Sequence, residues 1–214
     1  MRTTMKRWLV CLSVFLLACT TFMWAQGAGM TQVMKKYRSV HTLTASVVRI
    51  KHNVAFAEDA RLDGKLYFKA PGRMCMRFEG DKDMLLMEGN EFTMVESGRK
   101  SVAKGQTQAQ FESLVEVFKQ MVLGMDISVS PEELAEVKME EKDGLCTLTV
   151  TPRVDGGNKV RRRLLFSSFV LTVDLQKGEC KSLQMNERGQ NYTRYDFSSF
   201  MLDAHVPDTA FQLP

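Results

Sequence analysis

The chain has 214 residues, of which 44% are hydrophobic and 25% are charged, so one domain with a sizeable core is expected. Its formal net charge of +4 comes largely from Arg2, Lys6 and Arg7, because residues 26–214 hold 26 basic and 25 acidic residues. A chain so close to neutral beyond its first residues gives no support to nucleic-acid binding.

The first 25 residues have the pattern of a secretory signal peptide. A basic start precedes the apolar run Leu9–Ala18, which is too short for a membrane-spanning helix. We expect cleavage near Ala25 and a single exported domain over residues 26–214. The alternative is a lipobox at residues 16–19, in which Cys19 is lipidated and becomes the first mature residue. An uncleaved N-terminal anchor is a third interpretation.

Strand patterns dominate the next part of the chain. Apolar residues recur at helical spacing over residues 30–39, which predicts a short amphipathic helix. The strand-forming stretches that follow are residues 43–50, 60–69, 73–78, 84–87 and 92–95. Tight turns such as Pro71-Gly72 and Gly89-Asn90 join them, so an antiparallel meander is expected.

The hydrophobic period changes in the middle of the chain. Residues 107–125 carry an apolar stripe with a period of 3.6, and Ser130-Pro131 opens a short second helix. The later strand-forming stretches are residues 137–141, 146–150, 170–175, 181–185 and 191–197, and residues 207–214 form a tail. About ten strands and one strong helix predict a mainly β (α+β) fold. A curved sheet with helices packed into its concave side fits this set of elements.

Motifs for catalysis are missing from the sequence. The three histidines, His41, His52 and His205, form no metal-binding motif, and there is neither a GxSxG nucleophile motif nor a phosphate-binding glycine loop. We therefore expect no enzyme, no metal and no cofactor.

Two further features have an ordinary structural interpretation. Cys75, Cys146 and Cys180 are expected to be buried thiols, with a disulfide between two of them as the alternative. The segment 159–163, which contains three arginines, is expected to be a solvated sheet edge, with acidic lipid headgroups as the alternative partner.

The apolar residues suggest a cavity. Twelve methionines follow the leader, and the chain has 13 phenylalanines. Composition alone fits a dry core, but flexible methionine side chains adapt to irregular ligands, so their excess favours a cavity that can be filled. Strand alternation and the helical stripe give these candidate lipid-binding residues: Leu66, Phe68, Met74, Met76, Phe78, Met84, Leu86, Phe92, Met94, Phe111, Leu114, Val115, Phe118, Met121 and Val122.

Several stretches of the chain resemble the LolA family of periplasmic outer-membrane lipoprotein carriers. They are residues 43–48, 64–78, 85–92, 191–197 and 207–211, and the resemblance spans roughly residues 30–213. It implies an incomplete antiparallel β-barrel, or strongly curved sheet, with a helical lid over an apolar cavity that holds the acyl chains of lipoproteins during transfer. It also implies a monomer whose partners are an inner-membrane release complex and an outer-membrane acceptor.

The chain departs from the family at one position. In the best-known members a basic residue precedes the proline of the first hairpin and latches the lid, whereas Ala70 stands here. We assign the latch to no residue. The expected function is a periplasmic carrier or chaperone for lipoproteins or other lipids. The alternative is a membrane-anchored protein of the same fold, lipidated at Cys19, that acts as a lipid acceptor or envelope sensor.

Overall fold

The computed structural model describes residues 28–78, 82–121, 123, 131–153 and 164–214. The leader with Cys19 and Ala25, the arginine-rich segment 159–163 and Val122 lie outside these residues. What the sequence predicts for them therefore stays a prediction.

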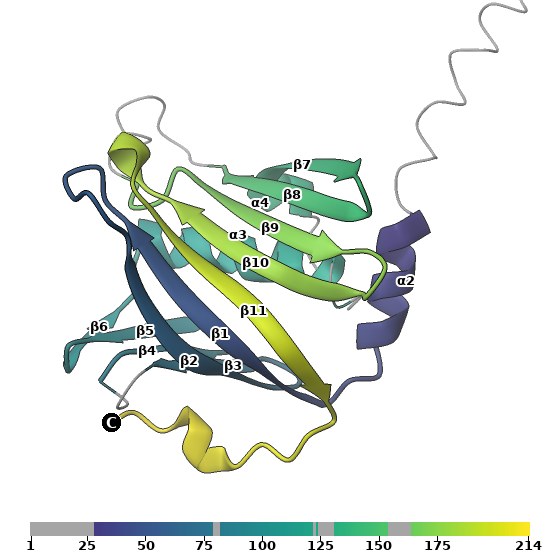
Figure 1. The fold of residues 1–214 in the computed structure, drawn as a ribbon, viewed down its shortest axis with the longest axis horizontal. Helices are drawn as coiled ribbons and strands as arrows, with labels where there is room; N and C mark the ends of the chain where they lie inside the picture. Colours follow the sequence, from purple (N-terminus) through teal and green to yellow (C-terminus); the bar gives the residue numbers. More distant parts are fainter. Residues whose placement is uncertain (1–27, 79–81, 122, 124–130, 154–163) are drawn as a thin grey trace, which may run out of the picture.

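One antiparallel sheet of eleven strands dominates the fold (Figure 1). The strands are β1 (Thr42–His52), β2 (Ala60–Lys69), β3 (Arg73–Phe78), β4 (Met84–Glu88), β5 (Glu91–Glu96), β6 (Arg99–Val102), β7 (Ala135–Lys142), β8 (Leu145–Pro152), β9 (Ser168–Asp174), β10 (Glu179–Asn186) and β11 (Tyr192–Leu202). Their order across the sheet is β6-β5-β4-β3-β2-β1-β11-β10-β9-β8-β7. The two long strands β1 and β11 thus lie in the middle and join two meanders. The sequence did not predict β6, because Arg-Lys-Ser-Val has no apolar alternation.

The helices agree with the predicted stripes. They are α2 (Ala28–Tyr37), α3 (Gln106–Met121) and the one-turn α4 (Pro131–Leu134), with short 3-10 turns η2 (Arg188–Gln190) and η3 (Asp208–Phe211). α2 packs at the turn between β9 and β10, where Lys36 Nζ donates to the Lys177 carbonyl at 2.8 Å. The order of elements therefore follows the sequence prediction closely.

The sheet is strongly curved and open. α3 contacts both β5 and β8, although seven strands separate these two in the sheet. One helix can reach both only if the two halves of the sheet bend toward each other around it. Among the described residues, the edge strands β6 and β7 do not pair with each other. The prediction of an incomplete barrel with a helix on its concave side is confirmed.

The convex face has a second, smaller core beneath the C-terminal segment. Cys75, Met84 and Leu86 are buried there against Val206 and Phe211. The segment is held by cationic side chains of β3. Arg77 Nε donates to the Ala210 carbonyl at 3.0 Å, and the Arg73 guanidinium lies 4.3 Å from the centre of the Phe211 ring. Both faces of this part of the sheet are therefore buried.

Gly64 allows β2 and β3 to approach closely. A Cβ atom at this position would lie 2.2 Å from the Arg77 carbonyl oxygen and 2.7 Å from Phe78 Cδ1. Since backbone cannot move as easily as a side-chain end, we expect Gly64→Ala to lower the free energy of unfolding by at least about 2 kcal/mol in urea denaturation. Gly72→Ala is the control. Its Cβ would meet Gly89 Cα at an ordinary 3.8 Å, so a change within about 0.5 kcal/mol is expected. Equal effects would contradict the close approach.

Candidate functional site

An apolar cavity of about 190 Å³ lies between the concave face of the sheet and α3. Neighbouring strands supply its floor because paired residues point to the same side. Leu66 pairs with Met76, and Phe68 pairs with Met74. The same two methionines pair with residues of β4 on their other side, Met76 with Leu85 and Met74 with Met87. A continuous apolar surface four strands wide results, since Phe92 of β5 pairs in turn with Met87.

α3 covers this floor with its apolar stripe. The Phe111 ring stacks on Phe92 with centroids 4.2 Å apart and meets Phe166 edge-on at 5.3 Å and Phe169 at 6.2 Å. These contacts connect β5 to the other half of the sheet through one helix residue. The N-terminal half of α3 also carries the buried Gln110. Its side-chain amide donates a hydrogen bond to the Phe166 carbonyl and accepts one from the Phe166 backbone N–H. The N-terminal half of α3 is therefore anchored on the sheet.

The sequence-predicted site residues divide by location. Those that line the cavity are Leu66, Phe68, Met74, Met76, Phe92, Phe111, Leu114, Val115 and Phe118. Phe78, Met94 and Met121 belong to the same concave core but do not line the cavity. Val122 lies outside the described residues. Binding of lipid by any of these side chains stays a prediction.

Met84 and Leu86 were placed on the wrong face by the sequence alternation. The structure buries both in the convex core, and Leu85 and Met87 line the cavity instead. The stretch Met84–Met87 is apolar at every position and buried on both faces. Its sequence therefore carries no alternation that could fix which residues face inward.

Other lining residues were not in the sequence prediction. The later strands contribute Leu171, Cys180, Leu183, Met185, Phe197 and Phe200, and the N-terminal helix contributes Tyr37. The sequence could have predicted two of them, because Leu183 and Met185 are two positions apart in a predicted strand and so point to the same face of the sheet. What the sequence did not show is that the second meander curls over the same space as the first.

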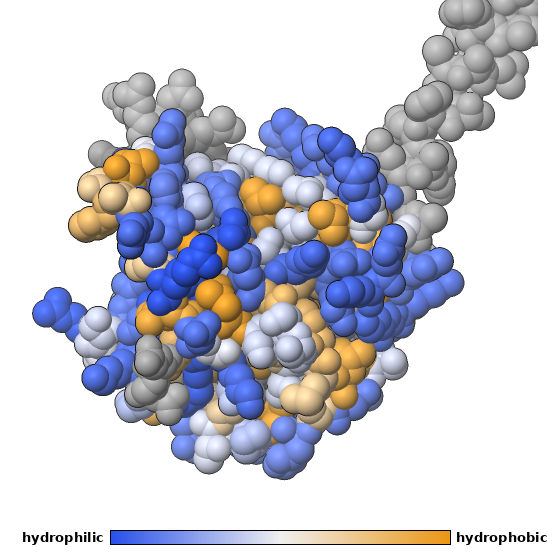
Figure 2. Space-filling view, in the orientation of Figure 1, coloured by the Kyte–Doolittle hydropathy of each residue, from blue (hydrophilic) through white to orange (hydrophobic). Residues whose placement is uncertain are grey.

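A polar end interrupts the apolar wall. Tyr37 and the adjacent Arg38, together with Lys119 of α3, contribute to it. Arg38 is exposed, so the cavity reaches the protein surface there. Figure 2 shows that hydrophobic side chains also reach the surface beside α2, near the end of β11. Lys119 is half-buried, with its Nζ 2.8 Å from Glu116 Oε1. Apolar and charged side chains therefore both line this part of the cavity.

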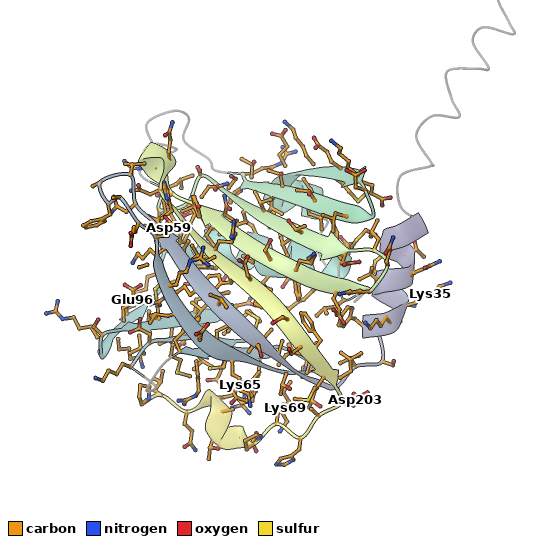
Figure 3. The ribbon with its side chains drawn as sticks, viewed as in Figure 1. Lys35, Asp59, Lys65, Lys69, Glu96 and Asp203 are labelled. Carbon is orange, nitrogen blue, oxygen red and sulfur yellow. The ribbon has the colours of Figure 1, made fainter. Side chains whose placement is uncertain are left out.

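The position of the absent latch is also part of the wall. Ala70 lines the cavity with a methyl group. Its basic neighbours Lys69 and Arg73 instead donate to Asp208 Oδ1 of the C-terminal segment, at 2.9 and 3.1 Å. Figure 3 shows Lys69 beside this segment, away from α3. Both hydrogen bonds therefore go to the C-terminal segment and not to α3.

Among the described residues, no group of three or more His, Cys, Asp or Glu side chains could hold a metal ion. Cys75, Cys146 and Cys180 are buried and form no disulfide with one another, which confirms the first of the two expectations for them. Burial raises the pKa of the Cys180 thiol to about 12 and that of Cys146 to about 11, so both are poor nucleophiles at neutral pH. Within the described residues, the helices are too short or too polar to cross a bilayer.

Comparison with known proteins gives likeness in structure only. No family model matches the chain, and no curated protein sequence matches it. A domain described as outer-membrane lipoprotein-sorting, from Vibrio parahaemolyticus, is 11% identical with a TM-score of 0.45, and the match covers 85% of this chain and 94% of that one. A LolA superfamily protein from Nitrosomonas europaea is 10% identical with a TM-score of 0.38, over 86% and 97% of the chains. The lipoprotein LppX from Mycobacterium tuberculosis is 8% identical with a TM-score of 0.33, over 86% and 99%.

The open, curved sheet with a helix on its concave side agrees with the architecture that the sequence resemblance implied. At such low identities and TM-scores, the function of this chain has to be inferred from its own cavity.

Cys146 and Cys180 provide a test of how tightly the concave core is closed. In the chain beginning at Gln26, we expect maleimide labelling of both thiols at neutral pH to be at least about a hundredfold slower than in urea, because burial disfavours the reactive thiolate. Mass spectrometry of peptides identifies the labelled residue. Rapid labelling of native Cys180 would show that the cavity wall opens to solvent without unfolding.

Proposed function

We propose that this protein is an extracytoplasmic carrier that holds the acyl chains of lipoproteins, or of other lipids, in the cavity beneath α3. The observation that supports this function is the cavity itself, whose wall consists mainly of aliphatic, aromatic and methionine side chains. Each methylene group that leaves water for such a wall contributes about 0.8 kcal/mol. Eight methylenes would therefore contribute about 6 kcal/mol, which retains a chain and still permits its release.

The size of the cavity indicates that loading requires movement. A cavity of about 150 Å³ can accept a benzene ring, whereas pockets for larger organic ligands have volumes of roughly 300–1,000 Å³. At about 190 Å³, the cavity has room for part of one acyl chain. Longer chains need the wall to yield.

The C-terminal half of α3 is the part of the wall best suited to yield. Gln110 and Ser113 bond to backbone outside the helix, Gln110 to Phe166 and Ser113 to the Leu134 carbonyl at 3.4 Å. By contrast, Phe118 and Met121 are only half-buried. The lid therefore opens at its C-terminal end, and the flexible methionines of the floor adapt to the chain that enters.

The leader supports a place outside the cytoplasm for this activity. After cleavage near Ala25, the soluble protein would collect cargo from an inner-membrane release complex and pass it to an outer-membrane acceptor, as the resemblance to LolA carriers implies. The lipobox-like residues 16–19 favour a second candidate, in which lipidated Cys19 tethers the same cavity to a membrane as a lipid acceptor or sensor. Neither candidate involves catalysis.

Phe118→Glu tests whether α3 belongs to the binding site. A carboxylate placed in the apolar wall is unfavourable beside an acyl chain, so we expect uptake of the neutral dye phenylnaphthylamine to weaken by at least about tenfold in Kd. Gln120→Glu is the matched control, since it adds the same charge to the same helix turn outside the cavity. Circular dichroism and thermal melts verify folding. Unchanged uptake by folded Phe118→Glu would remove α3 from the site.

The mature form and its cargo can be read together from the native protein. We expect native mass spectrometry of material extracted from its own envelope to show a chain that starts near Gln26 with an acyl species bound. A chain that starts at acylated Cys19 with an empty cavity would instead favour the anchored candidate. A chain that starts near Gln26 with no acyl species, and that takes up no dye, would contradict both.

A further inference from the structure

The loop between β1 and β2 exposes four apolar residues in a row, Val54, Ala55, Phe56 and Ala57, which we call the apolar tip. Phe56 and Val54, at 71% and 56%, are the two most exposed large hydrophobic side chains among the described residues. Figure 2 shows hydrophobic side chains gathered at this end of the molecule. A run of exposed apolar residues is unfavourable in water and usually marks a surface that meets a partner.

The base of the loop is fixed to the sheet. His52 Nδ1 lies 2.7 Å from Asp59 Oδ1, so the two ends of the loop are joined to each other. The His52 ring also stacks on Tyr192 of β11, with ring centroids 4.8 Å apart. Figure 3 shows Asp59 at this end of the sheet. The fold therefore holds the apolar tip outward, and neither Val54 nor Phe56 belongs to a hydrophobic core.

The first three backbone N–H groups of the apolar tip have partners within the protein. Val54 N–H donates to Asn191 Oδ1 at 3.1 Å. Ala55 N–H and Phe56 N–H both donate to oxygens of Asn53, at 2.9 Å each. Lipid chains offer no acceptor, so backbone donors that enter a bilayer have to be satisfied by the protein itself. These three donors can therefore leave water without losing a hydrogen bond.

The size of the apolar tip fits a bilayer better than another protein. A specific protein interface buries about 1,000 Å² or more and needs a complementary surface. Two large side chains on a protruding loop supply only a fraction of that area. A bilayer needs no matching pocket, and its attraction grows with the apolar area inserted. The exposed charges next in the chain, Glu58 and Arg61, have opposite signs, so the attraction is apolar and not electrostatic.

We propose that the apolar tip docks this protein onto the surface of a lipid bilayer, where Phe56 and Val54 insert among the headgroups and the upper acyl chains. The contact is weak and reversible, because even a single myristoyl chain binds a membrane only marginally. It is also distinct from the cavity. The cavity reaches the surface at Arg38, before β1 begins, whereas the tip follows the end of this strand, about 30 Å farther along. Docking therefore leaves that opening uncovered and does not rest on the proposed function.

Phe56→Trp gives a direct reading of insertion. The two tryptophans of the sequence, Trp8 and Trp24, lie in the leader, so the introduced indole is unique in the chain beginning at Gln26. With neutral phosphatidylcholine vesicles, we expect its emission to shift to the blue and to be quenched by lipids brominated near the headgroup. Met201→Trp is the matched control. Met201 is 55% exposed but pairs with Thr44 at the opposite end of β1, so its emission should not change.

Sedimentation with the same vesicles measures the contribution of the side chain. We expect Phe56→Ser to lower the partition coefficient by at least about fivefold, because it removes most of the inserted hydrocarbon. Binding of the parent should persist in high salt, since no ion pair with the lipid is involved. Met201→Ser is the control and should bind like the parent. Thermal melts verify that these exposed substitutions leave the fold intact.

Three outcomes would overturn the inference. The first is an indole at Phe56→Trp that responds no more than the one at Met201→Trp. The second is binding that requires anionic phosphatidylglycerol and disappears in high salt, because charge would then be the cause. The third is self-association that Phe56→Ser abolishes, without vesicle binding, because the tip would then join two copies of the chain. Phenylnaphthylamine uptake should be equal in Phe56→Ser and the parent, so failure of docking and failure of the carrier function are distinguishable.

Discussion

The packing of Phe111 against both halves of the sheet is the contact on which the rest of the structure depends. An open sheet of eleven strands has no closing pair of edges in its described part, so its curvature must be maintained from inside. Phe111 does this by stacking on Phe92 of one meander and meeting Phe169 of the other. Farther along α3, the side chains no longer fill the concave space, and the cavity is what remains.

The two faces of the sheet have different tasks. On the convex side, the C-terminal segment seals a small dry core, and Arg73 and Arg77 bind it through Asp208 and through backbone carbonyls. On the concave side, a helix anchored at one end covers an incompletely filled core. A firm floor with a yielding cover is the mechanical requirement for taking up and releasing flexible chains.

Sequence patterns were sufficient for much of this architecture. Alternation in β2, β3 and β5 and the stripe of α3 predicted nine lining residues, because each of these elements has one apolar and one mixed face. The inward-facing residues of β4 were predicted wrongly, because Met84–Met87 is apolar at every position. The C-terminal segment, which is distant in sequence, covers the convex face of this strand. The polar end was not predicted at all. It forms only through tertiary contacts that bring Tyr37 to residues more than a hundred positions away.

The hydrogen bonds of Gln110 have a mechanical consequence for α3. They make its second turn a pivot, and Phe118 lies eight residues farther along, a lever arm of about 12 Å at 1.5 Å per residue. A tilt of about 20° about this pivot would displace the Phe118 end by about 4 Å, which is close to the spacing of packed carbon chains. Under the proposed function, one extra hydrocarbon chain would correspond to a small rigid rotation of α3, with the helix still wound and the sheet intact.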